Sequence, residues 1–369
     1  MLVAFCIDKY FPFGGLQRDF LRIAVSVAKR GHNVRVYTRQ WEGDIPKGFE
    51  IIKVPTRSWS NHGKGRDFYC FVKSHINSHP VQKLVGFNKM PDLDFYFAGD
   101  VCYAERTDNK GLLYRLSARY RHYIEYERAV FEPGMKCKIL FLVPNQKQAY
   151  QRYYHTENNR FYFLPPGIDR NRRYDHRSPD TRLKFRQKHS VSDDEFLLLQ
   201  VCSNFELKGV DRSLKAIASL PPSIKSKVKF FVVGGDDIRV MKQLAKKLSI
   251  DHQVTFLGGR DDVADIMFAS DLMLHPARRE AAGIVILEAI VSTLPIVVSS
   301  NCGYSHYVIK ANSGVVIEEP FDQQDYNKVV LSLLSDGKLR AQYKQNALSF
   351  TNKEDLYSLP DFAANIILS

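Results

Sequence analysis

The 369-residue sequence predicts an α/β protein built from two successive doubly wound domains, each a parallel sheet covered by helices on both faces. Short apolar runs recur along the whole chain, and segments with helical periodicity separate them. The runs are continuous rather than alternating, which is typical of parallel strands buried on both faces. The length also exceeds what a single hydrophobic core usually organises.

The first series of elements begins at the N-terminus with a buried strand at Leu2–Cys6. A helix is expected next, because Leu16, Phe20, Ile23 and Val27 recur at helical spacing up to Arg30-Gly31. Further strands are expected at Val34–Thr38, Ile51–Val54, Leu84–Phe87, Phe95–Ala98 and Ile139–Val143.

A break in the pattern follows Leu164, where Pro165-Pro166-Gly167 opens a polar, arginine-rich stretch that runs to about Asp180. We interpret this stretch as the linker, which gives domains at residues 1–165 and 166–350 and a C-terminal segment at 351–369. Strands of the second series are expected at Phe196–Val201, Phe230–Val233, Val254–Leu257, Leu272–His275, Ile296–Ser299 and Val315–Ile317. The clearest helices are expected at Val210–Leu220, Met241–Leu248, Ile284–Val291 and, as an amphipathic tail, Leu356–Leu368. Two such domains would enclose a ligand cleft at the carboxyl ends of their strands.

The charge balance indicates an anionic partner: nucleic acid, an acidic membrane surface or a phosphorylated substrate. The net charge is +13, from 53 Lys and Arg against 40 Asp and Glu. Residues 1–150 hold 24 basic and 14 acidic side chains, whereas residues 251–369 hold 9 basic and 15 acidic side chains.

The six cysteines form no C-x-x-C pair, which argues against a thiolate zinc site and favours a reducing compartment. Asp8 and Lys9 interrupt the apolar start, so we expect a soluble, cytoplasmic protein.

The densest basic stretch is Tyr103–Phe131, in which Arg115, Arg119, Arg121 and Arg128 alternate with aromatic residues. Cationic side chains interleaved with aromatic anchors suit the headgroup region of an anionic bilayer. Two alternatives remain open at this point: a solvated helix whose tyrosines face its own core, and a surface that stacks on nucleic acid.

Two loops carry candidate ligand-binding residues. The loop Phe11–Asp19 contains Gly14-Gly15 just before a helix, so its backbone could approach an anion, although a simple tight turn has the same signature. It lacks the G-x-G-x-x-G spacing of dinucleotide-binding proteins. Lys208-Gly209 follows a buried strand, where the lysine could neutralise a leaving diphosphate; the alternative is an exposed loop lysine.

The strongest candidate site is the segment His275–Ala289, where a strand ends at His275 and a helix begins near Gly283. Glu280 then lies in the loop and Glu288 on the helix, and two carboxylates can bind the hydroxyl groups of two sugar rings. The first amides of the helix lack intrahelical partners and suit phosphate. Glu288 lies within an apolar face, so it could instead be a buried glutamate held by backbone donors.

No metal site is indicated. Asp92-Leu93-Asp94 has the form D-x-D, which binds a divalent ion in another transferase fold, but it is far in sequence from Lys208 and Glu288. The eleven histidines show no H-E-x-x-H spacing, and no phosphate-loop or G-x-S-x-G motif is present.

The Glu280-x7-Glu288 pair, Lys208-Gly209, the Gly14-Gly15 loop and the two-domain pattern together resemble the retaining, nucleotide-sugar-dependent glycosyltransferases of family four, which have the GT-B fold. Within that family the chain resembles the bacterial branch that adds glucose to the lipopolysaccharide core. Segments distributed over the whole length carry this resemblance: FPFGGLQRDF, VRVYT, WEGD, GFNKMP, DVCYAE, YRHY, LPPGI, KGVDRS, CGY and DLYSLP.

The resemblance implies roles for individual residues. In the donor site, Lys208 would stabilise the leaving diphosphate, Glu280 would bind the donor sugar and Glu288 the ribose. Gly14 and Gly15 would leave room for the donor, and the amides of Ala282, Gly283 and Ile284 would bind phosphate. Arg173 and Arg260 match positions near the nucleotide. Asp19 and Asp100 match acidic positions on the acceptor side, and Asp100 is expected to be catalytic together with Lys208 and Glu280. Leu207 departs from the family, in which an arginine often lies beside or just before the lysine, and Arg173 is our candidate substitute.

The implied function is a retaining, metal-independent glucosyltransferase that moves glucose from UDP-glucose to the first heptose of the lipopolysaccharide inner core. The implied protein is a monomer held peripherally on the cytoplasmic face of a Gram-negative inner membrane, with its C-terminal helix packed on the N-terminal domain. A UDP-galactose or GDP-sugar donor is an alternative that shares every motif. A basic nucleic-acid-binding protein and, remotely, a sugar-nucleotide epimerase are the others.

Overall fold

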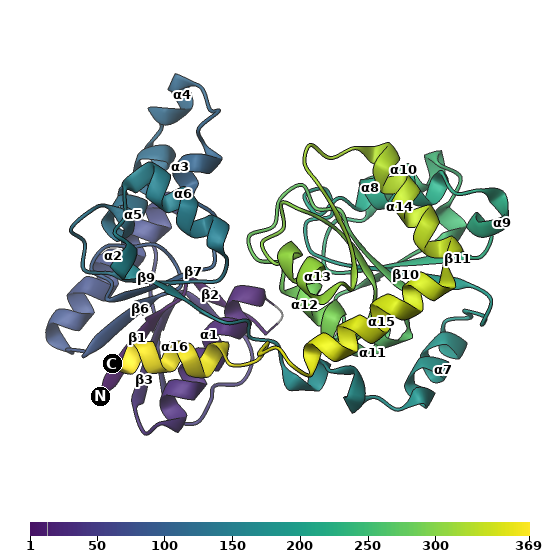
Figure 1. The fold of residues 1–369 in the computed structure, drawn as a ribbon. Helices are drawn as coiled ribbons and strands as arrows, with labels where there is room; N and C mark the ends of the chain where they lie inside the picture. Colours follow the sequence, from purple (N-terminus) through teal and green to yellow (C-terminus); the bar gives the residue numbers. More distant parts are fainter. Residues whose placement is uncertain (13) are drawn as a thin grey trace. The chain divides into compact units, whose positions relative to one another are not determined.

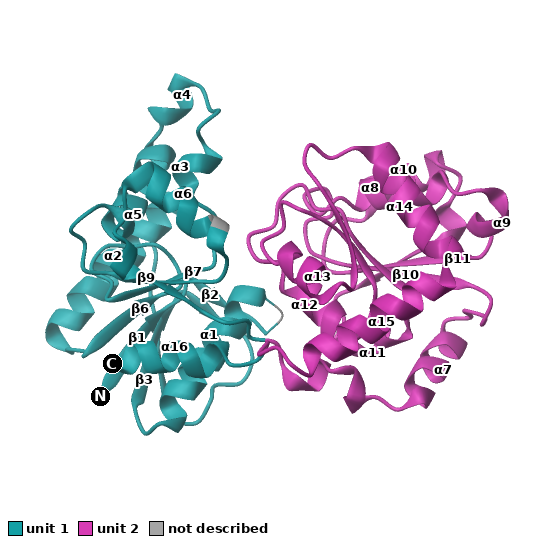
Figure 2. Cartoon of the chain, in the orientation of Figure 1, with its two compact units in different colours: residues 1–167, 357–369 teal, residues 168–356 magenta. Residues whose placement is uncertain are grey.

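The computed structural model describes residues 1–12 and 14–369, excepting the side chain of Asn145. Phe13, which belongs to the predicted glycine loop, lies outside the described residues. The chain divides into two compact units, residues 1–167 with 357–369 (unit 1) and residues 168–356 (unit 2), shown in Figure 2.

Unit 1 contains a seven-stranded parallel sheet and a small two-stranded one (Figure 1). Its strands are β1 (Leu2–Cys6), β2 (Lys9–Tyr10), β3 (Asn33–Thr38), β4 (Gln40–Trp41), β5 (Phe49–Lys53), β6 (Lys83–Gly86), β7 (Phe95–Ala98), β8 (Lys138–Phe141) and β9 (Phe161–Phe163). Its helices are α1 (Gly15–Lys29), α2 (Asn61–Ser78), α3 (Tyr103–Arg106), α4 (Leu112–Arg115), α5 (Ala118–Phe131), α6 (Pro144–Tyr154), the short 3-10 turn η1 (Asn158–Arg160) and α16 (Leu359–Leu368). The large sheet has the order β5-β3-β1-β6-β7-β8-β9, so the direction of winding reverses between β1 and β6.

The core of unit 1 forms around β1, whose residues Val3, Ala4, Phe5 and Cys6 are fully buried. Phe5 packs edge-on against Phe20 of α1, with ring centroids 5.9 Å apart. Burial of β1 on both faces explains why its sequence reads as a continuous apolar run.

The C-terminal helix α16 packs against α1 within unit 1. Ser26 Oγ donates a hydrogen bond to Asp361 at 2.6 Å, and the guanidinium of Arg30 lies 3.4 Å from the same carboxylate. Ala363, Ala364 and Ile367 of α16 are fully buried. The C-terminal helix therefore contributes apolar surface to unit 1.

Unit 2 is a six-stranded parallel sheet with the order β12-β11-β10-β13-β14-β15, which reverses between β10 and β13. Its strands are β10 (Phe196–Val201), β11 (Val228–Val233), β12 (Val254–Gly258), β13 (Leu272–His275), β14 (Ile296–Ser299) and β15 (Gly314–Ile317). Its helices are η2 (Arg170–Arg172), η3 (Tyr174–His176), α7 (Pro179–Lys188), α8 (Val210–Ala218), α9 (Pro222–Lys225), α10 (Arg239–Lys247), η4 (Asp251–Gln253), α11 (Val263–Ala269), α12 (Ile284–Val291), α13 (Ser305–Ala311), α14 (Gln323–Ser335) and α15 (Gly337–Thr351).

These two sheets confirm the predicted α/β class and the doubly wound arrangement. The short edge strand β9 was not predicted, because Phe161–Phe163 is only partly buried and its partner β8 supplies the pairing. The expected tail helix begins at Leu359 rather than Leu356. Leu356 is instead buried in unit 2, where its carbonyl accepts a 2.8 Å hydrogen bond from the amide of Ile168.

The basic segment Tyr103–Phe131 folds into α3, α4 and α5, and α4 stands out from the rest of unit 1 (Figure 1). Tyr126 and Phe131 of α5 are buried in the core. Leu112, Leu113 and Leu116 at α4 have 75%, 87% and 62% of their surface exposed. The segment therefore has both a core-facing side and an exposed apolar tip. Among the described residues, no helix combines the length and apolar character that crossing a bilayer requires.

One buried carboxylate joins α3 and α5. Glu127 is fully buried and accepts hydrogen bonds from the ammonium of Lys89, the amides of Tyr103 (2.8 Å) and Ala104 (2.9 Å), and the hydroxyl of Tyr154 (2.7 Å). These donors satisfy a charge that would be costly to bury alone.

We predict that Glu127→Ala lowers the free energy of unfolding of unit 1 by about 3–5 kcal/mol, because it leaves the mostly buried Lys89 ammonium without its carboxylate. Both tryptophans, Trp41 and Trp59, belong to unit 1, so urea unfolding followed by tryptophan fluorescence reports on this unit. Glu125→Ala, at an exposed position of the same helix, is the control and should leave the midpoint nearly unchanged. An equal midpoint for Glu127→Ala and the wild type would contradict the prediction.

Candidate functional site

The candidate site of unit 2 is formed where its sheet reverses direction. Strands β10 and β13 are neighbours and run parallel, so their carboxyl ends lie at the same edge. In doubly wound sheets the loops that leave such a pair of strands diverge and leave room for a ligand. Here the two loops carry Lys208 and Glu280.

Lys208 and Glu280, which the sequence proposes separately, are in direct contact: the Lys208 ammonium donates a hydrogen bond to Glu280 Oε2. His275 Nε2 lies 3.5 Å from the same oxygen. Burial favours the protonated form of Glu280, but the facing imidazole and the Lys208 charge outweigh it and lower the pKa of Glu280 to about 2. The carboxylate is therefore ionised at neutral pH and holds the lysine at the edge of the sheet.

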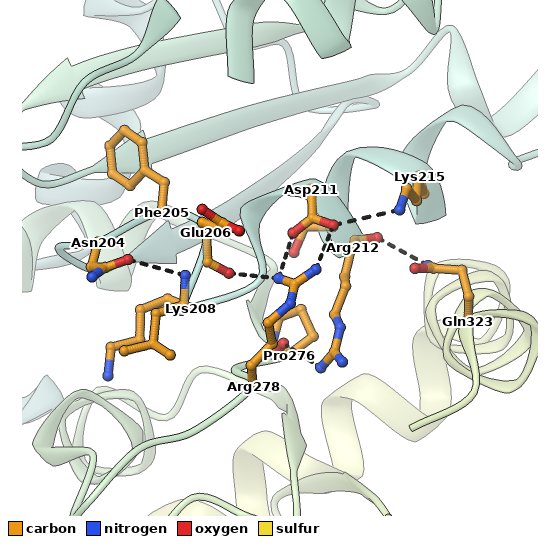
Figure 3. Close-up of polar contacts among 12 residues, drawn as sticks. Asn204, Phe205, Glu206, Lys208, Asp211, Arg212, Lys215, Pro276, Arg278 and Gln323 are labelled. Carbon is orange, nitrogen blue, oxygen red and sulfur yellow. Dashed lines mark hydrogen bonds and ion pairs between the residues drawn. The ribbon is translucent and has the colours of Figure 1, made fainter. Parts of the chain in front are cut away.

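The loop that carries Lys208 makes a sharp left-handed turn at Gly209, where φ is +71°. A Cβ atom at this position would lie 2.1 Å from the carbonyl oxygen of Pro276, so only glycine fits. The Lys208 amide donates to the carbonyl of Asn204 at 3.0 Å (Figure 3), and its own carbonyl accepts from Gln200 at 2.8 Å. These contacts fix the backbone from which the lysine side chain extends.

An ion pair between Asp211 and Arg278 ties the two loops together (Figure 3). Arg278 Nη1 and Nη2 lie 2.7 and 2.9 Å from the two oxygens of Asp211. The amide of Arg278 also donates to the carbonyl of Leu207 at 2.8 Å. Burial alone would raise the pKa of Asp211, but the bidentate hydrogen bonds of Arg278 lower it. The pair therefore holds the Lys208 loop against the Glu280 loop.

Arg212 also helps to join the Lys208 loop to the Glu280 loop. Its Nη1 donates to the carbonyl of Pro276 at 3.1 Å, and its own carbonyl accepts from Gln323 at 3.1 Å (Figure 3). The guanidinium carbon lies 3.7 Å from the ring centroid of Phe321, which fixes its plane.

The Glu280 loop ends at Gly283, whose φ of +85° turns the chain into α12. A Cβ atom there would come within 2.8 Å of Ile286 and 3.0 Å of Glu280 Cγ. Because α12 begins at Ile284, the amides of Ala282, Gly283 and Ile284 precede or open the helix and have no acceptor in a preceding turn. Helix and loop together present donors suited to an anion.

Glu288 lies on α12, where only 6% of its surface is exposed. The guanidinium of Arg172 lies 3.9 Å from Glu288 Oε1, so a neighbouring charge contributes to holding this carboxylate. Arg173, the residue proposed from the sequence, instead pairs with Asp175 at 2.8 Å and donates to Asn352 at 2.9 Å. Arg172, which the sequence did not single out, is thus close enough to Glu288 for an ion pair.

Arg260 lies beyond β12, which is separated from β10 by β11. Its guanidinium makes two hydrogen bonds with Asp262, at 2.8 and 2.5 Å. Among the residues that the structure describes, no contact joins Arg260 to Lys208, Glu280 or Glu288. The structure thus brings Lys208 and Glu280 together but leaves Arg260 apart.

The remaining proposed residues belong to unit 1. Gly14 precedes α1 as its N-terminal cap, and a Cβ atom on Gly15 would meet no other atom within 4 Å. Asp19 is partly buried on α1. Asp100 lines a cavity of about 520 Å³ in this unit.

Three residues of the site were missed by the sequence analysis: His275, Asp211 and Arg278. All three lie close in sequence to the predicted site residues, because Asp211 follows Lys208-Gly209 and the other two precede Glu280. Their pairing could not be read from spacing, since it depends on β10 and β13 being neighbours in the sheet. In the described part of the chain, no three His, Cys, Asp or Glu side chains gather as metal ligands.

Comparison with known proteins places the chain among glycosyltransferases. Residues 181–350, which lie within unit 2, match the family described as "Glycosyl transferases group 1". Over 368 residues the chain is 52% identical to the lipopolysaccharide glucosyltransferase WaaG of Escherichia coli (strain K12), with 100% of this chain and 98% of that protein covered.

Solved structures give the same result. The crystal structure of WaaG, described as a glycosyltransferase involved in lipopolysaccharide biosynthesis, matches with a TM-score of 0.95 and 52% identity over 99% of both chains. Anabaena Alr3699/HepE in complex with UDP-glucose matches with a TM-score of 0.79 and 18% identity, covering 100% of this chain and 99% of that one. The second likeness concerns the fold alone.

We predict that Arg278→Ala lowers the rate of sugar transfer by about 10- to 100-fold. The substitution removes the ion pair that holds the Glu280 loop against the Lys208 loop, and small displacements of catalytic groups lower the reaction rate strongly. Asp211→Ala should have a similar effect, and the double variant should be little worse than either single variant. Arg239→Ala, which removes an exposed arginine of unit 2, is the control. Strictly additive losses in the double variant would show that the two residues act independently.

Proposed function

The chain belongs to the group 1 glycosyltransferases, and we propose that it transfers glucose from UDP-glucose to a heptose of the lipopolysaccharide inner core, with retention of the anomeric configuration. The main structural support for this reaction is the contact between Lys208 and Glu280, at the edge of the unit 2 sheet where the strand order reverses. The lipopolysaccharide acceptor is supported by the full-length similarity to a lipopolysaccharide glucosyltransferase.

We assign the donor-binding residues as follows. Lys208 neutralises the leaving diphosphate, and Glu280 accepts hydrogen bonds from the glucose hydroxyls. The amides of Ala282, Gly283 and Ile284 bind phosphate oxygens, and Glu288 binds the ribose diol. The second positive charge, which Leu207 does not provide, comes from the arginines of the linker. Arg172 lies 3.9 Å from Glu288, and Arg173 is the neighbouring candidate.

The transfer step exchanges one bond at the anomeric carbon for another on the same face. The bond from C1 to the diphosphate oxygen breaks, and the acceptor hydroxyl oxygen bonds to C1. The hydroxyl proton passes to the departing phosphate oxygen, so no protein base is needed. Charge develops on the diphosphate as the bond breaks, and there Lys208 and the helix amides stabilise it.

Which donor sugar is bound depends on the loop residues that contact its hydroxyl groups, because candidate sugars differ in the orientation of single hydroxyls. UDP-galactose and GDP-sugars are therefore the alternative donors, and a donor panel separates them. Membership of an enzyme family sets aside the nucleic-acid-binding alternative.

We predict that Lys208→Ala and Glu280→Ala each lower glucose transfer by about 10²–10³-fold, because each loses a group that stabilises charge or orients the donor. The assay measures labelled glucose transferred from UDP-glucose to heptose-ended lipopolysaccharide in the presence of a chelator. Lys242→Ala and Asp193→Ala, at exposed positions of unit 2, are the controls. Wild-type turnover in either site variant would overturn the residue assignment, and loss of wild-type activity on chelation would overturn metal independence.

We further propose that unit 1 binds the surface of an anionic membrane through the tip formed by α4. Leu112, Leu113 and Leu116 are the exposed apolar side chains, and Arg115 on α4 and Arg121 on α5 are exposed cations of the same segment. Apolar anchors combined with cationic side chains are typical of peripheral membrane binding. The acceptor lipid would then be reached at the membrane surface.

We predict that the triple variant Leu112→Gln/Leu113→Gln/Leu116→Gln binds vesicles containing phosphatidylglycerol more weakly at every salt concentration. Arg115→Gln/Arg121→Gln should lower binding about fivefold per charge at low salt and flatten its salt dependence. Leu183→Gln, which replaces an exposed leucine of unit 2, is the matched control. Vesicle binding of the triple variant equal to that of the wild type would contradict the proposal.

A further inference from the structure

His275 is a buried histidine beside the candidate site of unit 2. It is the last residue of β13, it lies opposite Val298 of β14 in the sheet, and only 1% of its surface is exposed. Its Nε2 lies 3.5 Å from Glu280 Oε2, and apart from this approach neither ring nitrogen has a hydrogen-bond partner among the described residues. A buried imidazole N–H without an acceptor is costly, so the facing carboxylate oxygen is its natural partner.

The two carboxylate oxygens of Glu280 differ in their surroundings. Both the Lys208 ammonium and the His275 ring approach Oε2. Oε1 accepts no hydrogen bond from any residue that the structure describes, and 18% of the Glu280 side chain is exposed. A carboxylate held through one oxygen in this way offers its other oxygen to a ligand, and sugar hydroxyls are donors that such an oxygen binds.

The backbone of the Glu280 loop is fixed independently of this carboxylate. The loop that follows β14 holds it by two hydrogen bonds. The amide of Gly303 donates to the carbonyl of Glu280 at 3.3 Å, and the next amide, of Tyr304, donates to the carbonyl of Ala282 at 2.7 Å. Because these contacts anchor the loop, replacing the His275 ring would release the carboxylate and leave the loop in place.

Lys208, the other group at Glu280 Oε2, also has the leaving diphosphate to neutralise under the proposed function. When the donor binds, the ammonium shares its charge with the phosphate oxygens, and its contact with Glu280 weakens. His275 lies at the end of a buried strand and stays in place. A separation of 3.5 Å is long for a hydrogen bond, and hydrogen bonds at catalytic sites often tighten when substrate binds.

We propose that His275 is the positioning residue for Glu280: its Nε2–H donates to Oε2 and thereby directs Oε1 toward the hydroxyl groups of the donor sugar. His275 acts through Glu280 and contacts neither the uridine nor the diphosphate, so it contributes to binding of the sugar alone. The inference rests on the proposed function, because it takes the glucose of UDP-glucose as the ligand of Glu280.

The test compares the binding of UDP with that of UDP-glucose by isothermal titration calorimetry. His275→Leu, which removes the donor, should raise the Kd for UDP-glucose about tenfold, as expected for the loss of one hydrogen bond to a charged group. The Kd for UDP should not change, and this retained affinity shows that the site is folded. His275→Gln, whose amide nitrogen can take the place of Nε2, should restore most of the affinity for UDP-glucose. His252→Leu, at an exposed position of unit 2, is the matched control.

A double variant separates positioning from space filling. In the Glu280→Ala background, His275→Leu should change the Kd for UDP-glucose little further, because the ring has lost the group through which it acts. Equal losses for UDP and UDP-glucose, a Gln variant no better than the Leu variant, or an undiminished loss in the Glu280→Ala background would each overturn the proposal. So would a wild-type Kd for UDP-glucose in His275→Leu. If the wild type binds neither UDP nor UDP-glucose, the proposed function itself fails, and the role of His275 fails with it.

Discussion

The reversal of strand order in each parallel sheet is the constraint on which the candidate site of unit 2 and the cavity of unit 1 depend. In unit 2 the reversal separates the loops after β10 and β13, and in unit 1 it separates the loops after β1 and β6. Loops that leave neighbouring strands toward opposite faces cannot cover the edge between them, so a crevice remains. Lys208 and Glu280 occupy one such edge, and Lys9 and Lys89 occupy the other.

The charges at the unit 2 edge are compensated within the protein. In unit 2, Lys208 is paired with Glu280, and the loops beneath them are joined by Asp211 and Arg278, so the site is held together by internal ion pairs. Such pairs keep reactive groups in place, and an entering diphosphate would compete with Glu280 for the lysine. His275 would then remain beside Glu280, so the carboxylate keeps one of its two neighbours.

The segment Tyr103–Phe131 joins the cavity of unit 1 to the exposed apolar tip of that unit. Glu127 fixes α5 against α3 by taking hydrogen bonds from Tyr103 and Ala104. With its base fixed in this way, the segment presents leucines to solvent at α4 and basic and aromatic side chains to the cavity. A solvated helix with tyrosines in the core, the plainest interpretation of its sequence, therefore describes only its inner face, where Tyr126 is buried.

The sequence by itself determined the α/β class, most strand positions, and the two segments that carry Lys208 and Glu280, because apolar runs, glycines and charged loop residues are local signals. It could not pair Asp211 with Arg278, place Arg172 close to Glu288, or show that His275 is buried beside Glu280. Those features required the tertiary structure, which decides which strand ends are neighbours and which side chains lose contact with water. Contacts between residues some seventy positions apart, such as Lys208 and Glu280, arise only from the order of strands in the sheet.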